Sequence, residues 1–304
     1  MKFFSLLLLA TATSAFALET DNYLSWRQEL PDSSGDLNSY IQTEIEDVLK
    51  SSAGMNCEQV TFKVADRFKT GVRGEVFVNW STKNISDKIF PSTDHYIEQS
   101  IYVETPSPLL KFAPLAPNMQ VGGIYFGIDK LSHFASTGRR YFTEYLNQIK
   151  KGQTVEEAEN SAIHLGLSNE AGILGIWASG VFSYGDLEAN YQGLSFYRKF
   201  CLNQEDTYLK ETEGRWEMVK IPEIKDYVNP YWDETFNLSF NEPRTWKVVS
   251  KVLLEEYCPM REKENIVARF SLYKEKAKKS RSMTYIEALQ IDQQPQSFEE
   301  LCQK

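Results

Sequence analysis

The chain has 304 residues, a quarter of them charged, and its formal net charge at pH 7 is −9. An acidic chain of this kind repels phosphate backbones, so the composition argues against nucleic acid as a partner. The length is enough to build a substantial core, as one large domain or two modest ones.

The first 17 residues have the pattern of a cleavable secretory signal. Lys2 supplies a positive start, Phe3–Ala10 is an apolar run too short to span a bilayer, and Ala15-Phe16-Ala17 is a cleavage site of the A-x-A type. We therefore expect residues 1–17 to be removed and the mature chain to be periplasmic or secreted. No later stretch approaches the ~18 continuous apolar residues of a membrane span, so we do not expect an integral membrane protein.

Four cysteines occur in the chain, and none has C-x-x-C spacing. This spacing disfavours a zinc cluster, and an even number of cysteines in an oxidising compartment predicts two disulfide bonds. Three pairings are open for Cys57, Cys201, Cys258 and Cys302.

The N-terminal third is predicted to mix helix and strand. Apolar residues recur at helical spacing in Asp36–Lys50, which predicts a helix. Residues 57–104 contain short β-branched or alternating runs, at 60–64, 75–78 and 95–103, which predict a strand-rich region. Four prolines within 105–118 indicate a linker or an edge loop.

The middle of the chain is predicted to be helical. Four helices are expected at about 130–150, 155–166, 170–182 and 185–200, and Thr154 with Glu157 forms a capping-box start for the second. Three glycines in the third indicate close helix contact. Helices are expected again at about 244–257 and 262–279, after an irregular stretch.

Together these patterns predict an α+β protein that is mainly helical. We expect a central helical bundle at about 128–200, a smaller strand-rich N-terminal region and a helical C-terminal region. The predicted units are the signal at 1–17, a mixed region at 18–118 and a mainly helical domain at 119–304.

Candidate site residues cluster within the predicted bundle. Asp129 and His133 are four residues apart, so they share one helix face, and Asp186 and Asn190 repeat that spacing. Glu170 precedes an apolar, glycine-rich run. Packing of these helices would bring the five residues into one polar cluster.

Two kinds of chemistry fit such a cluster. A carboxyl in an apolar pocket has a raised pKa and can act as a general acid, which makes Glu170 the first candidate. Asp186 or Asp129 would then be the second carboxylate, or His133 the base. Alternatively, His133, Glu170 and Asp186, with Asn190 or Asp129, supply nitrogen and oxygen ligands for a divalent metal.

Each of these residues also has a structural interpretation. Asp129 could cap the helix that it starts, and Glu170 could complement a helix dipole behind an N-cap at Ser168. His133 and Asn190 could be satisfied core side chains. Under this interpretation the protein is not an enzyme, and the cluster is a hydrogen-bond network.

The motif Asp129-Lys-Leu-Ser-His133-Phe134, then Glu170, then Ser183-x-x-Asp186-Leu-x-x-Asn190-x-x-Gly193 resembles a known pattern. It is similar to small bacterial envelope proteins of the YfiM type, over about residues 128–195 only, and to the D-K-x-x-H segment of VanZ-like proteins. The chain departs from the pattern in having Asn169-Glu170 where the family has a Lys-Glu pair, and in lacking the Asp that follows. The resemblance implies an envelope location and helices packed around these polar residues, and it implies no activity. Glu170 ahead of Tyr191-Gln-Gly193 is also similar to the arrangement in lysozyme-type glycosidases.

These observations favour an exported hydrolase that acts on peptidoglycan or another glycan, with Glu170 as general acid and Asp186 and His133 as its partners. Asp129, Asn190, Tyr184 and Tyr191 are expected to bind substrate, and the two tyrosines to border a groove whose other wall is the region 57–104. No cofactor is required, and a divalent metal on His133, Glu170 and Asp186 is the alternative. A non-catalytic envelope protein is the competing hypothesis.

Overall fold

The computed structural model describes residues 19–71, 74–91, 96–107, 110, 115–172, 175–177, 179–202, 206–289, 294 and 297–303. The predicted signal at 1–17 lies outside the described residues. The described chain is mainly helical, with small antiparallel two-stranded sheets. No helix in these ranges is both long enough and apolar enough to cross a membrane.

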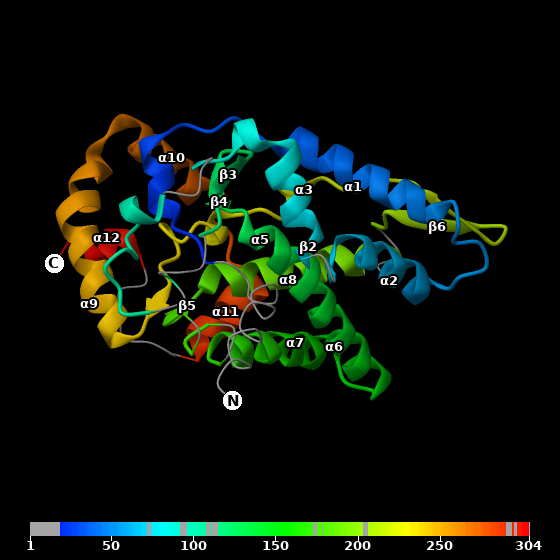
Figure 1. Ribbon diagram of the computed structural model, residues 1–304. Coiled ribbons are helices and arrows are strands. Elements are labelled where there is room, and N and C mark those ends of the chain that lie inside the picture. Colours follow the sequence, from blue (N-terminus) through cyan, green and yellow to red (C-terminus); the bar gives the residue numbers. More distant parts are fainter. Residues whose placement is uncertain are drawn as a thin grey trace, which may run out of the picture.

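The longer helices fall into three groups along the chain (Figure 1). The first group is α1 (Ser34–Leu49), α2 (Cys57–Phe68) and α3 (Val76–Asn84). The second is α5 (Asp129–Ser132), the π-helical turn η4 (His133–Thr137), α6 (Gly138–Lys150), α7 (Val155–Glu170) and α8 (Tyr184–Arg198). The third is α9 (Pro243–Val252), α10 (Glu264–Lys276), α11 (Arg281–Ala288) and α12 (Phe298–Leu301).

Short elements connect these helices. The strand pairs are β1 (Thr70–Gly71) with β2 (Gly74–Glu75), β3 (Asn118–Val121) with β4 (Ile124–Gly127), β5 (Val181–Phe182) with β8 (Phe240–Asn241), and β6 (Leu209–Thr212) with β7 (Arg215–Met218). Single helical turns are η1 (Asn22–Arg27), η2 (Ser86–Lys88), η3 (Tyr96–Gln99), η5 (Ile224–Asp226), η6 (Pro230–Trp232), η7 (Leu253–Tyr257) and η8 (Cys258–Glu262).

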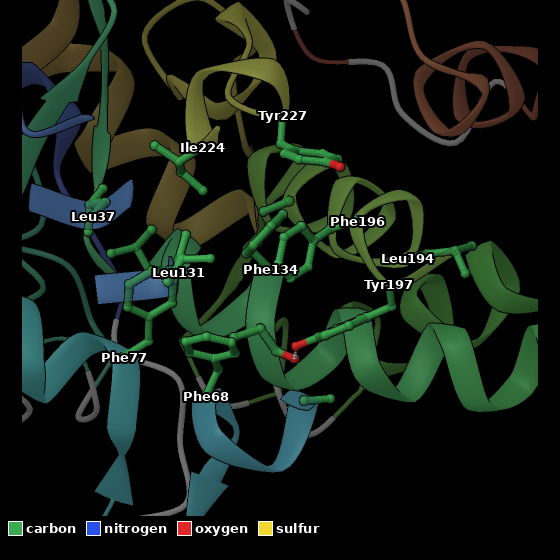
Figure 2. Packing of buried hydrophobic residues seen from close by; sticks show 14 of the residues in the cluster. Leu37, Phe68, Phe77, Leu131, Phe134, Leu194, Phe196, Tyr197, Ile224 and Tyr227 are labelled. Atoms are coloured by element: carbon green, nitrogen blue, oxygen red, sulfur yellow. Dashed lines mark hydrogen bonds between the residues drawn. The ribbon is translucent and has the colours of Figure 1, made fainter. Parts of the chain in front are cut away.

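The main hydrophobic core joins the first two helix groups. Apolar side chains from α1, α2 and α3 meet those of α5, η4, α6 and α8 in one cluster. Phe134 of η4 lies near its centre, with ring centroids 5.0 Å from Phe196 of α8 and 5.6 Å from Tyr227 (Figure 2). The packing of η4 against α8 fixes which polar side chains of the two elements come together.

A second core lies at the other end of the molecule, around η1, α9, η7, α10 and α12 (Figure 1). Trp26 of η1 packs there edge-on against Tyr257, Phe270 and Phe298. A third, smaller cluster joins α7, α8 and α11.

Both predicted disulfide bonds are present, and the structure decides the pairing. Cys57, at the start of α2, is bonded to Cys201, which follows α8. Cys258, at the start of η8, is bonded to Cys302, which directly follows α12. Each bond joins segments that are distant along the chain.

The prediction of a strand-rich region at 57–104 is wrong for its clearest runs. Residues 60–64 lie within α2, and residues 76–78 begin α3. Asn56 and Gln59 form a capping box that starts α2, and Val60, Val64 and Phe68 share its buried face. The spacing of residues 60–64 fits both a strand and a helix. The capping box and the buried face of α2 select the helix. His95 lies outside the described residues.

The predicted third helix of the bundle, 170–182, is also wrong. Glu170 is instead the last residue of α7, and the described residues that follow form turns up to β5. Gly180 has a φ of +81°, and a Cβ at Gly175 would lie 2.1 Å from the Glu170 carbonyl oxygen. Both positions need glycine for the chain to turn back on α7. The other predicted helices of the bundle are present.

Candidate functional site

A buried lysine organises the polar cluster. The ammonium of Lys130, in α5, lies 2.8 Å from Asp129 Oδ2, 2.7 Å from Asp186 Oδ1 and 2.7 Å from Glu234 Oε1. The Lys130 side chain is 0 % exposed. Three nearby carboxylates hold its pKa above the usual value, and they outweigh burial, which acts in the opposite direction. An ion group of this kind is stable only if its members stay paired, because an unpaired buried charge is costly.

His133 joins the cluster from the next turn of the same helix. Its Nε2 lies 3.1 Å from Asp186 Oδ2, and its Nδ1 lies 3.2 Å from Asn190 Oδ1. Asp186 and Asn190 both belong to α8, which begins at the N-cap Ser183. The Ser183 hydroxyl accepts a bond from the Asp186 backbone N–H and donates to Glu234 Oε1. The predicted i, i+4 pairs on two helices do face each other.

Close backbone contact makes this arrangement possible. A Cβ on Gly193 would lie 2.0 Å from the Phe134 carbonyl oxygen and 2.8 Å from the Cα of Gly138. Only glycine at these positions lets α8 approach η4 and the start of α6 so closely. The π-helical turn begins at His133 itself, a local irregularity that is frequent at functional sites.

Glu170 enters the cluster from the end of α7. It is 3 % exposed, and burial raises its pKa well above the usual range, with further increases from the neighbouring Asp186 and Glu19. Its place at the C-terminus of a helix adds to this effect, because the helix dipole disfavours a carboxylate there. The helix-start role considered from the sequence is wrong. Ser168 lies inside α7 and donates to the His164 carbonyl oxygen.

The carboxyl groups of the cluster differ in their protonation. The pKa of Asp186 is lowered, because His133, Lys130 and Ser183 together outweigh burial. The pKa of Asp129 is raised to about 7 by burial, which Lys130 only partly offsets. The cluster therefore places Asp186, whose pKa is lowered, beside Glu170, whose pKa burial raises.

Asp129 is not the N-cap that the sequence suggested. Ile128 holds that position, and one oxygen of Asp129 binds Lys130. Asp129 Oδ1 has no hydrogen-bond partner among the described residues, although the residue is 1 % exposed. A buried carboxylate oxygen in this state is unusual and indicates a further partner.

The two predicted binding tyrosines lie beside the cluster and face the core formed with α7 and α11. Tyr184 is buried there with its ring near that of Phe182, and Tyr191 is half-buried. The region 57–104 contributes no residue to this third hydrophobic cluster. Tyr184 therefore packs inward.

A small cavity adjoins the cluster at Glu234. Its volume is about 20 Å³, which corresponds to about one water molecule and excludes a sugar. Four of its lining residues each carry a buried oxygen that has no hydrogen-bond partner within the described chain: Asn22 Oδ1, Tyr23 Oη, Ser239 Oγ and Asn241 Oδ1. The cavity next to the cluster therefore has a partly polar lining.

Three residues in or beside the cluster were not singled out from the sequence: Lys130, Glu234 and Glu19. Lys130 stood within the motif Asp129-Lys130 but was given no role, and its apolar neighbours Ile128 and Leu131 were the signal of its burial. Glu234 lies in a stretch with no motif or periodicity. Glu19, which accepts a hydrogen bond from the Ser179 hydroxyl, is the second residue after the predicted cleavage site.

The cluster thus unites Asp129, His133, Glu170, Asp186 and Asn190, the five residues expected to converge, around a lysine that the sequence had not singled out. Comparison with protein-family models, curated proteins and solved structures finds no match to the chain.

Proposed function

We propose that this protein is an exported envelope hydrolase that acts on peptidoglycan or another glycan. One observation carries the proposal: Glu170 and Asp186 interact in one buried cluster, and their pKa values are displaced in opposite directions. Glycan hydrolysis requires such a pair, with one carboxyl protonated and one ionised. Two disulfide bonds support an oxidising compartment outside the cytoplasm.

In this mechanism Glu170 donates its proton to the oxygen of the leaving sugar. Asp186, kept ionised by Lys130 and His133, supports the reacting centre as the second carboxylate. In its neutral form His133 would take the proton of the attacking water, while the contact with Asp186 holds the ring in place. Glu170 is 3 % exposed, so a polymer reaches it only if neighbouring residues move aside.

An exposed aromatic ring supports a glycan as the substrate. Trp177 lies seven residues after Glu170, in the turns that follow α7, and is 78 % exposed. The Ile176 backbone N–H donates to the Glu170 carbonyl oxygen, which ties this segment to the end of α7. A tryptophan face offers apolar area to a sugar ring, while its edge remains polar.

The test is digestion of purified cell-wall sacculi by the mature protein. We expect Glu170→Gln to reduce the rate at least 100-fold, since general acid catalysis contributes roughly 10² to 10⁴-fold. Glu188→Gln is the matched control, because Glu188 is also buried with a raised pKa but binds Ser280 and Asn229 outside the cluster. Glu170→Gln protein that digests sacculi as fast as wild type would show that the assignment is wrong.

Burial favours a second candidate, a non-catalytic envelope protein in which the cluster holds α5, α7 and α8 together. Every charged member of the cluster is less than a tenth exposed. This function predicts that Glu170→Gln is neutral and that Glu170→Ala loses about 1–3 kcal/mol of stability. Urea unfolding of both variants, measured beside the digestion assay, separates the two candidates.

A further inference from the structure

Three side chains of the cluster have the geometry of metal ligands. Asp129, His133 and Asp186 each offer one donor atom, and these atoms lie within 4.8 Å of one another. Asp129 and His133 come from consecutive turns of one helix, and Asp186 comes from α8. In a tetrahedral site, ligand atoms that are about 2.0–2.2 Å from the ion are about 3.3–3.6 Å apart, so side-chain shifts of at most about 1 Å complete the set.

Lys130 leaves one oxygen of each aspartate for a second cation. Its ammonium binds Asp129 Oδ2 and Asp186 Oδ1. The other oxygen of Asp129 has no hydrogen-bond partner among the described residues, and the other oxygen of Asp186 faces His133. The lysine thus orients both carboxylates while it contacts only one oxygen of each.

Asn190 selects the tautomer of His133 that binds metals. The Asn190 side-chain oxygen can only accept a hydrogen bond, so His133 Nδ1 carries the proton. In the neutral ring, Nε2 then carries the lone pair and is the nitrogen available to a metal; it lies 3.1 Å from Asp186 Oδ2. A histidine whose other ring nitrogen donates to an oxygen is the usual arrangement in metal sites.

The charge of the cluster also fits a divalent ion. Three carboxylates contact the single ammonium of Lys130, which leaves two formal negative charges when all three are ionised. Their burial makes this excess costly, and a divalent cation neutralises it.

We propose that Asp129, His133 and Asp186 form a binding site for a divalent transition metal ion, Zn²⁺ in the first instance. Zn²⁺ accepts both imidazole nitrogen and carboxylate oxygen as ligands. Three protein ligands leave a fourth position for water. The binding site stands independently of hydrolysis. Its chemical use rests on the proposed function. With the ion bound, His133 and Asp186 would act as ligands instead of base and second carboxylate, the ion would supply an activated water, and Glu170 would remain the acid.

Calorimetric titration of chelator-treated protein with Zn²⁺ tests the site. We expect one ion per chain for the wild type, and at least a tenfold loss of affinity for both His133→Gln and Asp129→Asn. His164→Gln is the matched control, because His164 is an exposed histidine of α7 that binds the Tyr285 hydroxyl. Its affinity should equal that of the wild type.

Two results would overturn the site: no binding of Zn²⁺ by folded wild-type protein, or wild-type affinity in both ligand variants. Circular dichroism of each variant establishes folding, and Asp129→Asn provides the answer if His133→Gln does not fold. Glu170→Gln should bind Zn²⁺ normally. Binding without digestion of sacculi by the wild type would refute the proposed function and leave the metal site standing.

Discussion

Individual buried charges in this protein are supported by neighbours of quite different kinds. Lys130 has three carboxylates, whereas Arg269 donates to the hydroxyl and carbonyl oxygens of Ser25 and stacks 3.5 Å from the centroid of the Tyr125 ring. Asp21 has no cation in hydrogen-bond contact among the described residues and accepts backbone N–H bonds from Tyr23 and Ile101. Burial therefore has the largest effect on the pKa of Asp21.

Asp21 should make the protein less stable as the pH rises. Burial raises its pKa from 3.8 to about 6, although backbone hydrogen bonds and Arg27 oppose the shift. The folded state holds the proton more tightly, so this contribution is complete below pH 4 and is lost between pH 4 and about 6. The difference between the two pKa values corresponds to about 3 kcal/mol of unfolding free energy.

Asp21→Asn should remove this dependence. Urea unfolding measures the free energy of unfolding of the variant and of wild type. We expect the variant's value to rise relative to that of wild type by up to about 3 kcal/mol between pH 4 and pH 7. The exposed Asp87→Asn controls for the change of charge. A difference between Asp21→Asn and wild type that stays constant over this range would contradict the argument.

At the scale of the elements, α8 has the central place. It packs on η4, α6, α7 and α11, and it carries Asp186 and Asn190 on one face. Gly193 of α8 lies backbone to backbone against Phe134 of η4 and Gly138 at the start of α6. The distance between the two elements sets the distance from His133 to both α8 residues.

Gly193→Ala should separate α8 from η4. The new Cβ would meet the Phe134 carbonyl oxygen at 2.0 Å, and rigid backbone cannot yield as a side chain can. We expect a loss of about 2 kcal/mol or more of stability, at the upper part of the usual range for overpacking.

The matched control for this variant is Gly35→Ala in the first turn of α1, where an added Cβ meets nothing within 4 Å. Alanine is the better helix former, so this change should be neutral or stabilising by up to about 1 kcal/mol. Equal effects of the two substitutions in thermal unfolding would refute the close-contact argument. Loss of Zn²⁺ affinity in folded Gly193→Ala would further support the proposed site.

At the scale of the whole molecule, each disulfide bond ties one of the two larger cores across a long stretch of sequence. Cys57–Cys201 spans 144 residues and joins α2 to the end of α8, beside the main core. Cys258–Cys302 spans 44 residues and holds the C-terminal segment to η8, beside the second core. Long closed loops restrict the unfolded chain most.

Replacing both members of a pair by serine should therefore destabilise the protein. Loop length predicts a loss of about 5 kcal/mol for Cys57/Cys201 and about 4 kcal/mol for Cys258/Cys302. Urea unfolding of each double variant, and of wild type with a reductant, measures the loss. Wild-type stability unchanged by complete reduction would contradict the role assigned to both bonds.

The sequence by itself determined much of the local structure. Helical spacing predicted α1 and the helices of the second group, although 170–182 is not a helix, and the capping residue Thr154 starts α7 as its motif predicts. The i, i+4 pairs Asp129/His133 and Asp186/Asn190 also follow from the chain alone, because helical geometry places such residues on one face.

Tertiary structure decided the remainder. Residues 60–64 satisfy both strand and helix periods, so only the cap at Asn56 and the shared core select the helix. Glu234 comes from an irregular stretch, and its meeting with Lys130, 104 residues away, depends on packing that no local pattern encodes. Protonation, disulfide pairing and free ligand atoms likewise depend on which groups burial brings together, and burial is a property of the folded chain as a whole.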